Sequence, residues 1–391
     1  QQQQQQPLPP CGRCGGCGRC GRWLGAAALT VAALVITIVS ALTWFHSDPS
    51  ATATAGFYRD SLRRAPPAPP PPACADEVGV PRAARVAWPR GGQGSRVVAI
   101  GDVHGDRMNF YRALRAARLV DARHRWSAGR DVLVLTGDLV ERGADTKSVL
   151  EAALRLTREA RAAGGAVIQL LGNHEIMTLR GRMKYVNDKD VASFGGAAAR
   201  ARAFSAAGLW GRRLRCLPAV VMVGGDVFVH AGLLSKWVDR GLDALNADVR
   251  DALLSESFRA PVLGTEGPLW TRLYSRKYAP GEEDTPCPAL RDVLQRIGAY
   301  RMIVGHTVQH GAIKQRCGGQ LIMIDTGLSY KYDANPSALI VRGVRNETMA
   351  VYPNAGTDED GHDAETAAQW VDLSNTQEVE AFSRTSWARR D

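Results

Sequence analysis

Short apolar runs alternate with longer amphipathic stretches through the middle of the chain. Arg96–Ile100, Val132–Leu135 and residues 167–171 are predicted strands, because each run is short and almost wholly apolar. The stretches 106–118 and 145–163, which lie between them, are predicted helices. Strands that alternate with helices in this way predict an α/β fold with parallel strands.

A much longer apolar run, residues 23–45, comes before this pattern and contains no charged residue. As a helix it would reach roughly 34 Å, enough to cross a bilayer core of about 30 Å. Basic residues precede the run at Arg13, Arg19 and Arg22, and no other follows until Arg59. By the positive-inside rule the run is a single-pass membrane anchor with a cytosolic N-terminal side. The remainder of the chain is then expected in a secretory-pathway lumen or outside the cell.

A cleaved signal peptide is the alternative, and it would make the protein secreted. Small residues that suit a cleavage site follow the run at positions 51–53 and 53–55. The run is longer than the usual apolar core of a signal peptide, which favours the anchor.

The segments on both sides of the predicted anchor have low complexity. Residues 1–22 are rich in Gln and carry a cysteine at every third position from Cys11 to Cys20, which suits either palmitoylation beside a membrane or no function. Residues 46–94 include a run of prolines and are predicted to be a linker. We expect one folded domain at 95–353 and a C-terminal tail at 354–391.

Composition and cysteine content bear on partners and compartment. The net charge is +10, but the basic residues are scattered rather than gathered in one stripe with aromatic residues, so no nucleic-acid partner is expected. Four cysteines follow the predicted anchor, and an oxidising compartment would let them form disulfides. Four cysteines allow three pairings, among which we favour one that contains Cys287–Cys317.

Each of the three predicted strands ends in glycine and polar residues. The three strand ends read Gly101-Asp102-Val103-His104-Gly105, Gly137-Asp138 and Gly172-Asn173-His174-Glu175. A single aspartate at such a position is usually a turn residue or a helix cap. Here the same explanation would have to apply separately to the polar residues of all three strand ends, which makes a shared function the better explanation. Because ligands of α/β sheets bind outside the carboxyl ends of the strands, we expect these side chains to meet.

Two later apolar runs also end in a histidine, at His230 and His306. Carboxylates, imidazoles and one amide oxygen together form a ligand set for two divalent metals. Asp138 is the natural bridge, since one carboxylate can offer an oxygen to each ion. The candidate ligands are Asp102, His104, Asp138, Asn173, His230 and His306.

The motifs at the five predicted strand ends, in their order along the chain, resemble those of the phosphoprotein-phosphatase branch of the calcineurin-like metallophosphoesterase superfamily. That branch has GDxHG, GDxVDRG, GNHE and two later histidines, and this chain has GDVHG, GDLVERG, GNHE, VHAG and VGHT. Within the branch the chain is most similar to Shewanella-like protein phosphatases, through segments such as RMKYVNDKDVASFGG and GPLWTR. The resemblance implies a central β-sandwich flanked by helices. It also implies an enzyme that hydrolyses phosphomonoesters, with phosphorylated proteins as the favoured substrates.

The resemblance also assigns roles to residues. Two divalent metals, Mn, Fe or Zn, would be held by the candidate ligands and would activate a hydroxide nucleophile. His174 would be the general acid that protonates the leaving alcohol. Arg142 and Arg272 would clamp the phosphate.

Glu141 departs from the family pattern, which usually has Asp at this position to orient the catalytic histidine. One interpretation is a tolerated substitution, in which Glu141 still holds His174. A second is that the chain has drifted towards diadenosine-tetraphosphatase-like relatives, which also lack the Asp, and would hydrolyse dinucleoside polyphosphates. A third is a pseudophosphatase that binds phosphoproteins without turnover.

Residues 181–210 are expected to cap the site and to select the substrate. The Arg- and Ala-rich part of this cap, Ala197–Phe204, is explained equally well as a solvated helix face. Asp325 is expected to be structural rather than a metal ligand, and His310 is not assigned to the site.

Overall fold

The computed structural model describes residues 74, 80–81, 83–88, 95–343, 347–353, 368–375, 377–379 and 381–382. The predicted anchor at 23–45 and the segment 1–22 lie outside the described residues, as do parts of the predicted linker and tail. Among the helices of the described part, none combines the length and the apolar character that a membrane crossing requires.

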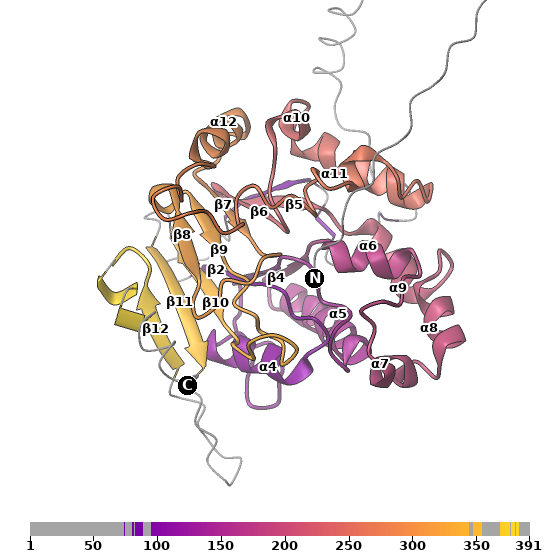
Figure 1. Ribbon diagram of the computed structural model, residues 1–391. Coiled ribbons are helices and arrows are strands. Elements are labelled where there is room, and N and C mark those ends of the chain that lie inside the picture. Colours follow the sequence, from indigo (N-terminus) through magenta and orange to yellow (C-terminus); the bar gives the residue numbers. More distant parts are fainter. Residues whose placement is uncertain are drawn as a thin grey trace, which may run out of the picture. The chain divides into compact units, whose positions relative to one another are not determined.

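Two six-stranded sheets form the centre of the fold (Figure 1). The first sheet has the order β1 (Arg85–Val86), β5 (Val220–Val223), β6 (Asp226–Val229), β7 (Arg301–Val304), β9 (Leu321–Met323) and β8 (Lys314–Arg316). The second has the order β12 (Ala368–Asp372), β11 (Glu347–Pro353), β10 (Ala338–Arg342), β2 (Arg96–Ile100), β3 (Val132–Leu135) and β4 (Ala166–Gln169). Strands β2, β3 and β4 are parallel, and β10 to β12 complete their sheet in antiparallel fashion.

The two sheets pack face to face, which confirms the predicted β-sandwich. Alternate residues of β2, such as Val97 and Ala99, belong to the same buried cluster as Phe228 of β6 and Ile303 of β7. The residues between them on β2 point to the opposite face and join a second cluster with the helices. This alternation follows from the two-residue period of a strand, and both faces are apolar because both are covered.

Helices cover the outer faces of the sandwich. They are α4 (Arg107–Ala116), α5 (Thr146–Ala162), α6 (Asn173–Leu179), α7 (Asp188–Ser193), α8 (Ala197–Phe204), α9 (Leu209–Cys216), α10 (Ser235–Val238), α11 (Leu242–Leu254) and α12 (Cys287–Ile297), with 3-10 turns at Pro261–Leu263 and Cys317–Gly319. Helices α4 and α5 lie on the β2–β4 side, and α10 to α12 on the β5–β7 side (Figure 1). The first strands and helices therefore lie where the apolar pattern predicts them.

The sandwich includes residues on both sides of the predicted 95–353 domain. Strand β1 pairs with β5, and β12 pairs with β11. Two disulfides add covalent links, Cys74–Cys216 and the predicted Cys287–Cys317. The second of these confirms the pairing that we favoured.

Candidate active site

The candidate site lies at the carboxyl ends of the strands of both sheets. Asp102 and Asp138 follow the neighbouring strands β2 and β3, and Asn173 begins α6 just after β4. His230 and His306 follow β6 and β7, which pair in the other sheet. The backbone N–H of His306 donates to both carboxylate oxygens of Asp102 at 3.1 Å, so the two sheets meet at this point.

A cavity of about 260 Å³ opens where these strand ends meet. Its walls are formed by Asp102, His104, Asp138, Arg142, Asn173, His174, Arg272, His306, Val308, Asp325 and Tyr332. Of the residues predicted for the site, only Glu141 and His230 are not in this wall. Both are buried directly behind it, where each contacts a residue of the wall.

Close backbone contact between the second and third strand ends requires glycine. Gly137 has a φ of +98°, and a Cβ placed on it would lie 2.5 Å from the backbone nitrogen of Gly172. A Cβ on Gly172 would in turn lie 2.1 Å from Oδ1 of Asp138. Only glycine fits at either position, which explains why the motifs combine glycine with an acidic or amide residue.

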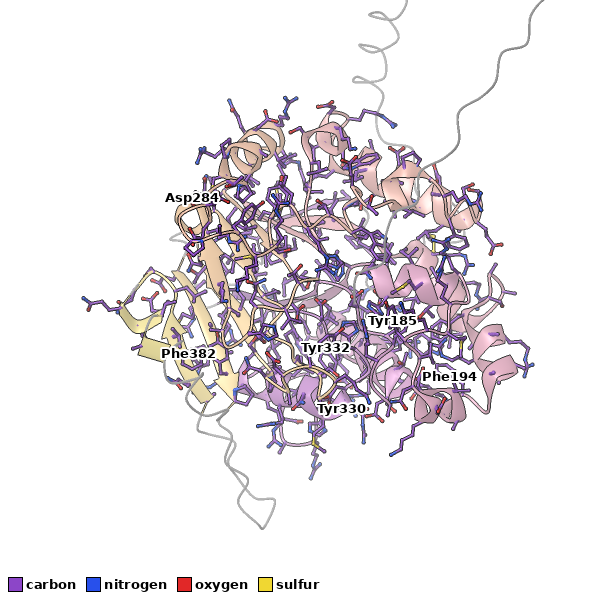
Figure 2. All side chains as sticks on the ribbon, in the orientation of Figure 1. Tyr185, Phe194, Asp284, Tyr330, Tyr332 and Phe382 are labelled. Atoms are coloured by element: carbon purple, nitrogen blue, oxygen red, sulfur yellow. A yellow bond between two sulfur atoms is a disulfide. The ribbon has the colours of Figure 1, made fainter. Side chains whose placement is uncertain are left out.

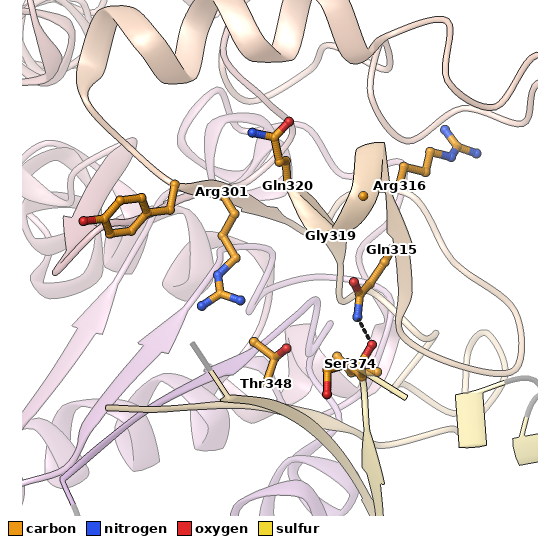
Figure 3. Close-up of a pocket in the computed structure, with 10 residues that line it drawn as sticks. Arg301, Gln315, Arg316, Gly319, Gln320, Thr348 and Ser374 are labelled. Carbon is orange, nitrogen blue, oxygen red and sulfur yellow. Dashed lines mark hydrogen bonds between the residues drawn. The ribbon is translucent and has the colours of Figure 1, made fainter. Parts of the chain in front are cut away.

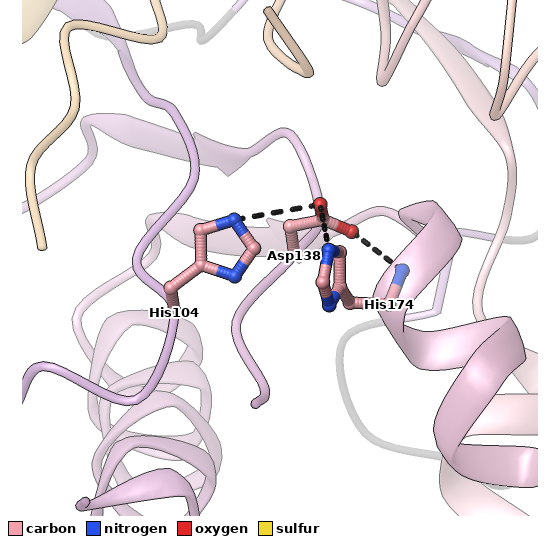
Figure 4. A group of neighbouring side chains, drawn as sticks. All are labelled: His104, Asp138 and His174. Atoms are coloured by element: carbon pink, nitrogen blue, oxygen red, sulfur yellow. Dashed lines mark hydrogen bonds and ion pairs between the residues drawn. The ribbon is translucent and has the colours of Figure 1, made fainter. Parts of the chain in front are cut away.

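Asp138 belongs to two groups of potential metal ligands, the first of which is drawn in Figure 4. One group is His104, Asp138 and His174, and the other is Asp138, His230 and His306, each with its ligand atoms within 4.8 Å of one another. Oδ2 of Asp102 lies 3.9 Å from Nε2 of His104, beside the first group. A carboxylate shared by two groups is the arrangement expected of a bridging ligand.

The charges of the site fit divalent cations. Burial alone would lower the pKa of His230, but the carboxylates of Asp138 and Asp102 raise this pKa to about 10. The buried carboxylates therefore favour a positive charge next to them. Burial lowers the pKa of His306 to about 2, with the charges of His230 and Arg272 adding to the effect, and its imidazole is therefore neutral. Nδ1 of His306 lies 3.1 Å from Nε2 of His230, so the two imidazoles bring these nitrogens together in the second ligand group. A neutral imidazole can offer such a nitrogen to a metal.

The candidate general acid, His174, is held by Glu141. Oε2 of Glu141 lies 2.7 Å from Nδ1 of His174, and the hydroxyl of Thr178 donates to Oε1 at 2.9 Å. Glu141 has a φ of +66°, an uncommon conformation that sets the starting point of the longer side chain. Burial lowers the pKa of His174, but Asp138 and Glu141 outweigh it and raise that pKa above its ordinary value. The extra methylene of glutamate is therefore accommodated, and the two carboxylates favour the protonated form of His174.

Two guanidinium groups line the same cavity. Arg142 contacts two aromatic rings, with its guanidinium carbon 3.9 Å from the centre of Tyr185 and 5.6 Å from that of Tyr332. Both tyrosines are labelled in Figure 2. Arg272 is held by Thr307, whose hydroxyl accepts from Nη1 at 2.8 Å. Paired guanidinium groups suit recognition of a phosphate.

Some residues of the site were not predicted from the sequence. Glu175 is buried and accepts backbone N–H groups from Asp138, Leu139 and Gly172, so it holds two strand ends together. Its place in the GNHE motif was a signal that could have been used. Tyr332 had no such signal, because it lies in a loop without periodicity. Asp325 is part of the cavity wall, and His310 pairs with Asp333 outside the cavity. Arg200 of α8 is buried in an ion pair with Asp190 and is therefore not on a solvated helix face.

A larger hollow of about 580 Å³ lies elsewhere, between β8 and the end of β12 (Figure 3). Its wall includes Arg301 and Arg316 but no histidine or carboxylate. Arg301 is already paired with Asp226 at 2.6 Å. This hollow lacks the ligands for a metal, so size alone does not identify the reactive site.

Comparison with known proteins agrees with this geometry. Residues 95–310 match the model of the calcineurin-like phosphoesterases. The chain belongs to the calcineurin-like phosphoesterase family. This phosphoesterase is 32% identical over 304 residues to Shewanella-like protein phosphatase 2 of Arabidopsis thaliana, across 64% of this chain and 76% of that protein. It is 31% identical over 246 residues to Shewanella-like protein phosphatase 1 of Plasmodium berghei, across 60% and 67%.

The phosphoesterase fold is also shared with a solved structure. The cold-active protein-tyrosine phosphatase of a psychrophilic Shewanella species superposes with a TM-score of 0.61 at 24% identity, over 75% of this chain and 84% of that chain. Family membership and the ligand groups around Asp138 make this protein a metal-dependent phosphoric-ester hydrolase.

Replacing Thr178 by valine tests the support of Glu141 in this phosphoesterase. The change leaves Oε1 of a buried carboxylate without its donor, and a hydrogen bond to a charged group contributes about 1.5–3 kcal/mol. We expect kcat for an alkyl phosphate to fall roughly tenfold, since only part of that energy orients His174. Thr178→Ser should restore most of the activity. Thr157→Val removes another buried hydroxyl, far along α5, and should leave kcat unchanged; equal losses in the two valine variants would contradict the proposed support.

Proposed function

We propose that this phosphoesterase hydrolyses phosphomonoesters, with phosphorylated proteins as its substrates. The observation that carries the proposal is the cavity that brings Arg142, Arg272 and His174 together with the potential metal ligands around Asp138. A phosphate there would meet donors for its oxygens and an acid for its leaving group. The protein phosphatases among its relatives support proteins as the substrates.

The residues of the chain divide the reaction between them. Divalent metals bound by the ligand groups would supply Lewis acidity and lower the pKa of water. Arg142 and Arg272 bind the non-bridging phosphate oxygens and orient the ester. His174 donates its proton to the ester oxygen as the bond to phosphorus breaks, so the product leaves as a neutral alcohol. Glu141 keeps the histidine in place and favours its protonated form.

A substrate panel tests the proposal with the 391-residue chain and manganese. Phosphate release would be measured from phosphoserine, phosphothreonine and phosphotyrosine peptides, from an aryl phosphate and from diadenosine tetraphosphate. We expect turnover of at least one phosphopeptide. Cleavage of the dinucleotide without any peptide would contradict the proposed substrate, and binding of phosphopeptides without turnover of any substrate would favour a pseudophosphatase.

A further inference from the structure

A basic loop runs from the end of helix α6 back to the catalytic cavity. The helix begins at Asn173, in the cavity wall, and at about 1.5 Å per residue its far end is roughly 10 Å away. The loop then carries Arg180, Arg182 and Lys184, all exposed, before it returns at Tyr185. Tyr185 stacks on Arg142, and its carbonyl accepts the backbone N–H of Arg142 at 2.7 Å. The loop is therefore tied at both ends to catalytic residues.

A second hollow, of about 640 Å³, adjoins the start of this loop. It is lined by Leu179, Arg180, Glu256, Ser257, Phe258, Arg259 and Ala260. Arg180 lies over the ring of Phe258, and Arg259 adds another exposed cation. The carboxylate in its wall, Glu256, is already neutralised by Arg215 at 2.8 Å. The hollow thus presents a net positive charge, with Leu179 and Phe258 as apolar residues in its wall.

Four exposed cations lie along this loop and the adjoining hollow. Arg180, Arg182, Lys184 and Arg259, which together we name the basic rim, pair with no carboxylate among the described residues. Two other exposed cations, Lys236 and Arg240, do have acidic partners, Glu266 and Asp248. Unpaired like charges repel one another, and an acidic ligand would relieve that repulsion.

We propose that the basic rim binds acidic residues that flank the phosphorylated residue of a protein substrate. The inference rests on the proposed function, because it deepens the substrate class of the same site. A peptide whose phosphate lies between Arg142 and Arg272 would extend along the loop and into the second hollow. Residues a few positions from the phosphorylated one would then meet the rim, since an extended chain spans about 3.3 Å per residue.

The expected selectivity follows from the strength of exposed ion pairs. Each such pair strengthens binding by a factor of about 1.4 to 5. With two to three pairs formed, we expect kcat/KM for an acidic phosphopeptide to exceed that for its neutral counterpart by about tenfold. The preference should shrink in 0.5 M salt, because exposed charges are screened there.

The test compares two matched phosphopeptides, one with three Glu near the phosphorylated residue and one with Gln at the same positions. The 391-residue chain with manganese is compared with Arg182→Glu/Lys184→Glu and with a control, Arg158→Glu/Arg161→Glu. The control reverses two exposed arginines on α5 and changes the net charge equally. We expect the Glu/Gln ratio of kcat/KM to be about ten in the wild type and in the control, and to fall to one or below in the loop variant.

Three other outcomes would each reject a specific statement. A wild-type ratio near one, with both peptides hydrolysed, would overturn the basic rim while the proposed function stands. An equal fall of the ratio in the loop variant and the control would show that net charge, not the rim, selects the peptide, and would also overturn the inference. Hydrolysis of an aryl phosphate but of neither peptide would reject the protein substrate, and the inference with it.

Discussion

Asp138→Asn is expected to remove both metals and to lower phosphate release by about a thousandfold or more. Asp138 belongs to both ligand groups, so losing its charge weakens both at once. Asparagine keeps the shape, and its amide oxygen can still accept the backbone N–H of His174, as Oδ1 of Asp138 does at 2.8 Å. Metals supply several kcal/mol of transition-state stabilisation, which corresponds to at least a thousandfold in rate. Metal content after dialysis and phosphate release from an aryl phosphate would both be measured.

Asp226→Asn is the matched control for this change. Asp226 is also a buried carboxylate at one end of a strand, but its partner is Arg301 and it lies at the opposite end of β6 from His230. The control should lose thermal stability, because it leaves a buried guanidinium without its anion. It should nonetheless keep its metals. Full metal content in Asp138→Asn would contradict the bridging role, whereas metal loss in both variants would indicate a general effect of destabilisation.

The strand ends could be predicted from the sequence because the information there is local. An apolar run of four or five residues predicts a buried strand, and a polar residue beside glycine at its end has few explanations in a core. Asp102, Asp138 and Asn173 follow this rule, and the parallel order of β2, β3 and β4 then brings them together. Topology, not any detail of the side chains, makes this step reliable.

The surroundings of the site could not be predicted, because they depend on tertiary partners. Tyr185 lies in the range 181–210, which is expected from the sequence to cap the site, whereas Tyr332 lies in a loop far along the chain. Nothing in the local sequence of either tyrosine shows that it contacts Arg142. In the sequence, Thr178 looks like an ordinary helix residue. Its function as a hydrogen-bond donor is visible only in the structure, where its hydroxyl contacts the carboxylate of Glu141. Strands β1 and β12 were missed for a related reason. Their strand character depends on the neighbours with which they pair, and short edge strands carry little intrinsic signal.

Replacing His174, the proposed general acid, is the second change with a large expected effect, and the size of this effect should depend on the leaving group. His174→Asn removes the proton donor, and general acid catalysis contributes about 10²- to 10⁴-fold. We expect that loss for an alkyl phosphate, such as a phosphoserine peptide. An aryl phosphate should lose much less, since its leaving oxygen is already a weak base. Measuring kcat for both substrates separates the loss of an acid from a general defect, which would lower the two equally. His124→Asn, which changes a histidine stacked on Tyr111, should alter neither.

Glu141 variants then test how the acid is held and protonated. Burial opposes the protonated form of His174, while the Asp138 and Glu141 carboxylates favour it and raise the pKa. Glu141→Gln removes one of these charges and lowers the pKa. Because an acid must be protonated to act, activity is lost as pH rises through that pKa, so the alkaline limb of kcat should move to lower pH. Glu141→Asp restores the residue usual in the family but shortens the side chain. The carboxylate oxygens of Glu141 lie 2.7 Å from His174 and 2.9 Å from Thr178, and the shorter aspartate would not reach both partners as well. We expect it to lower kcat several-fold, and a gain in activity would show instead that glutamate is a handicap here.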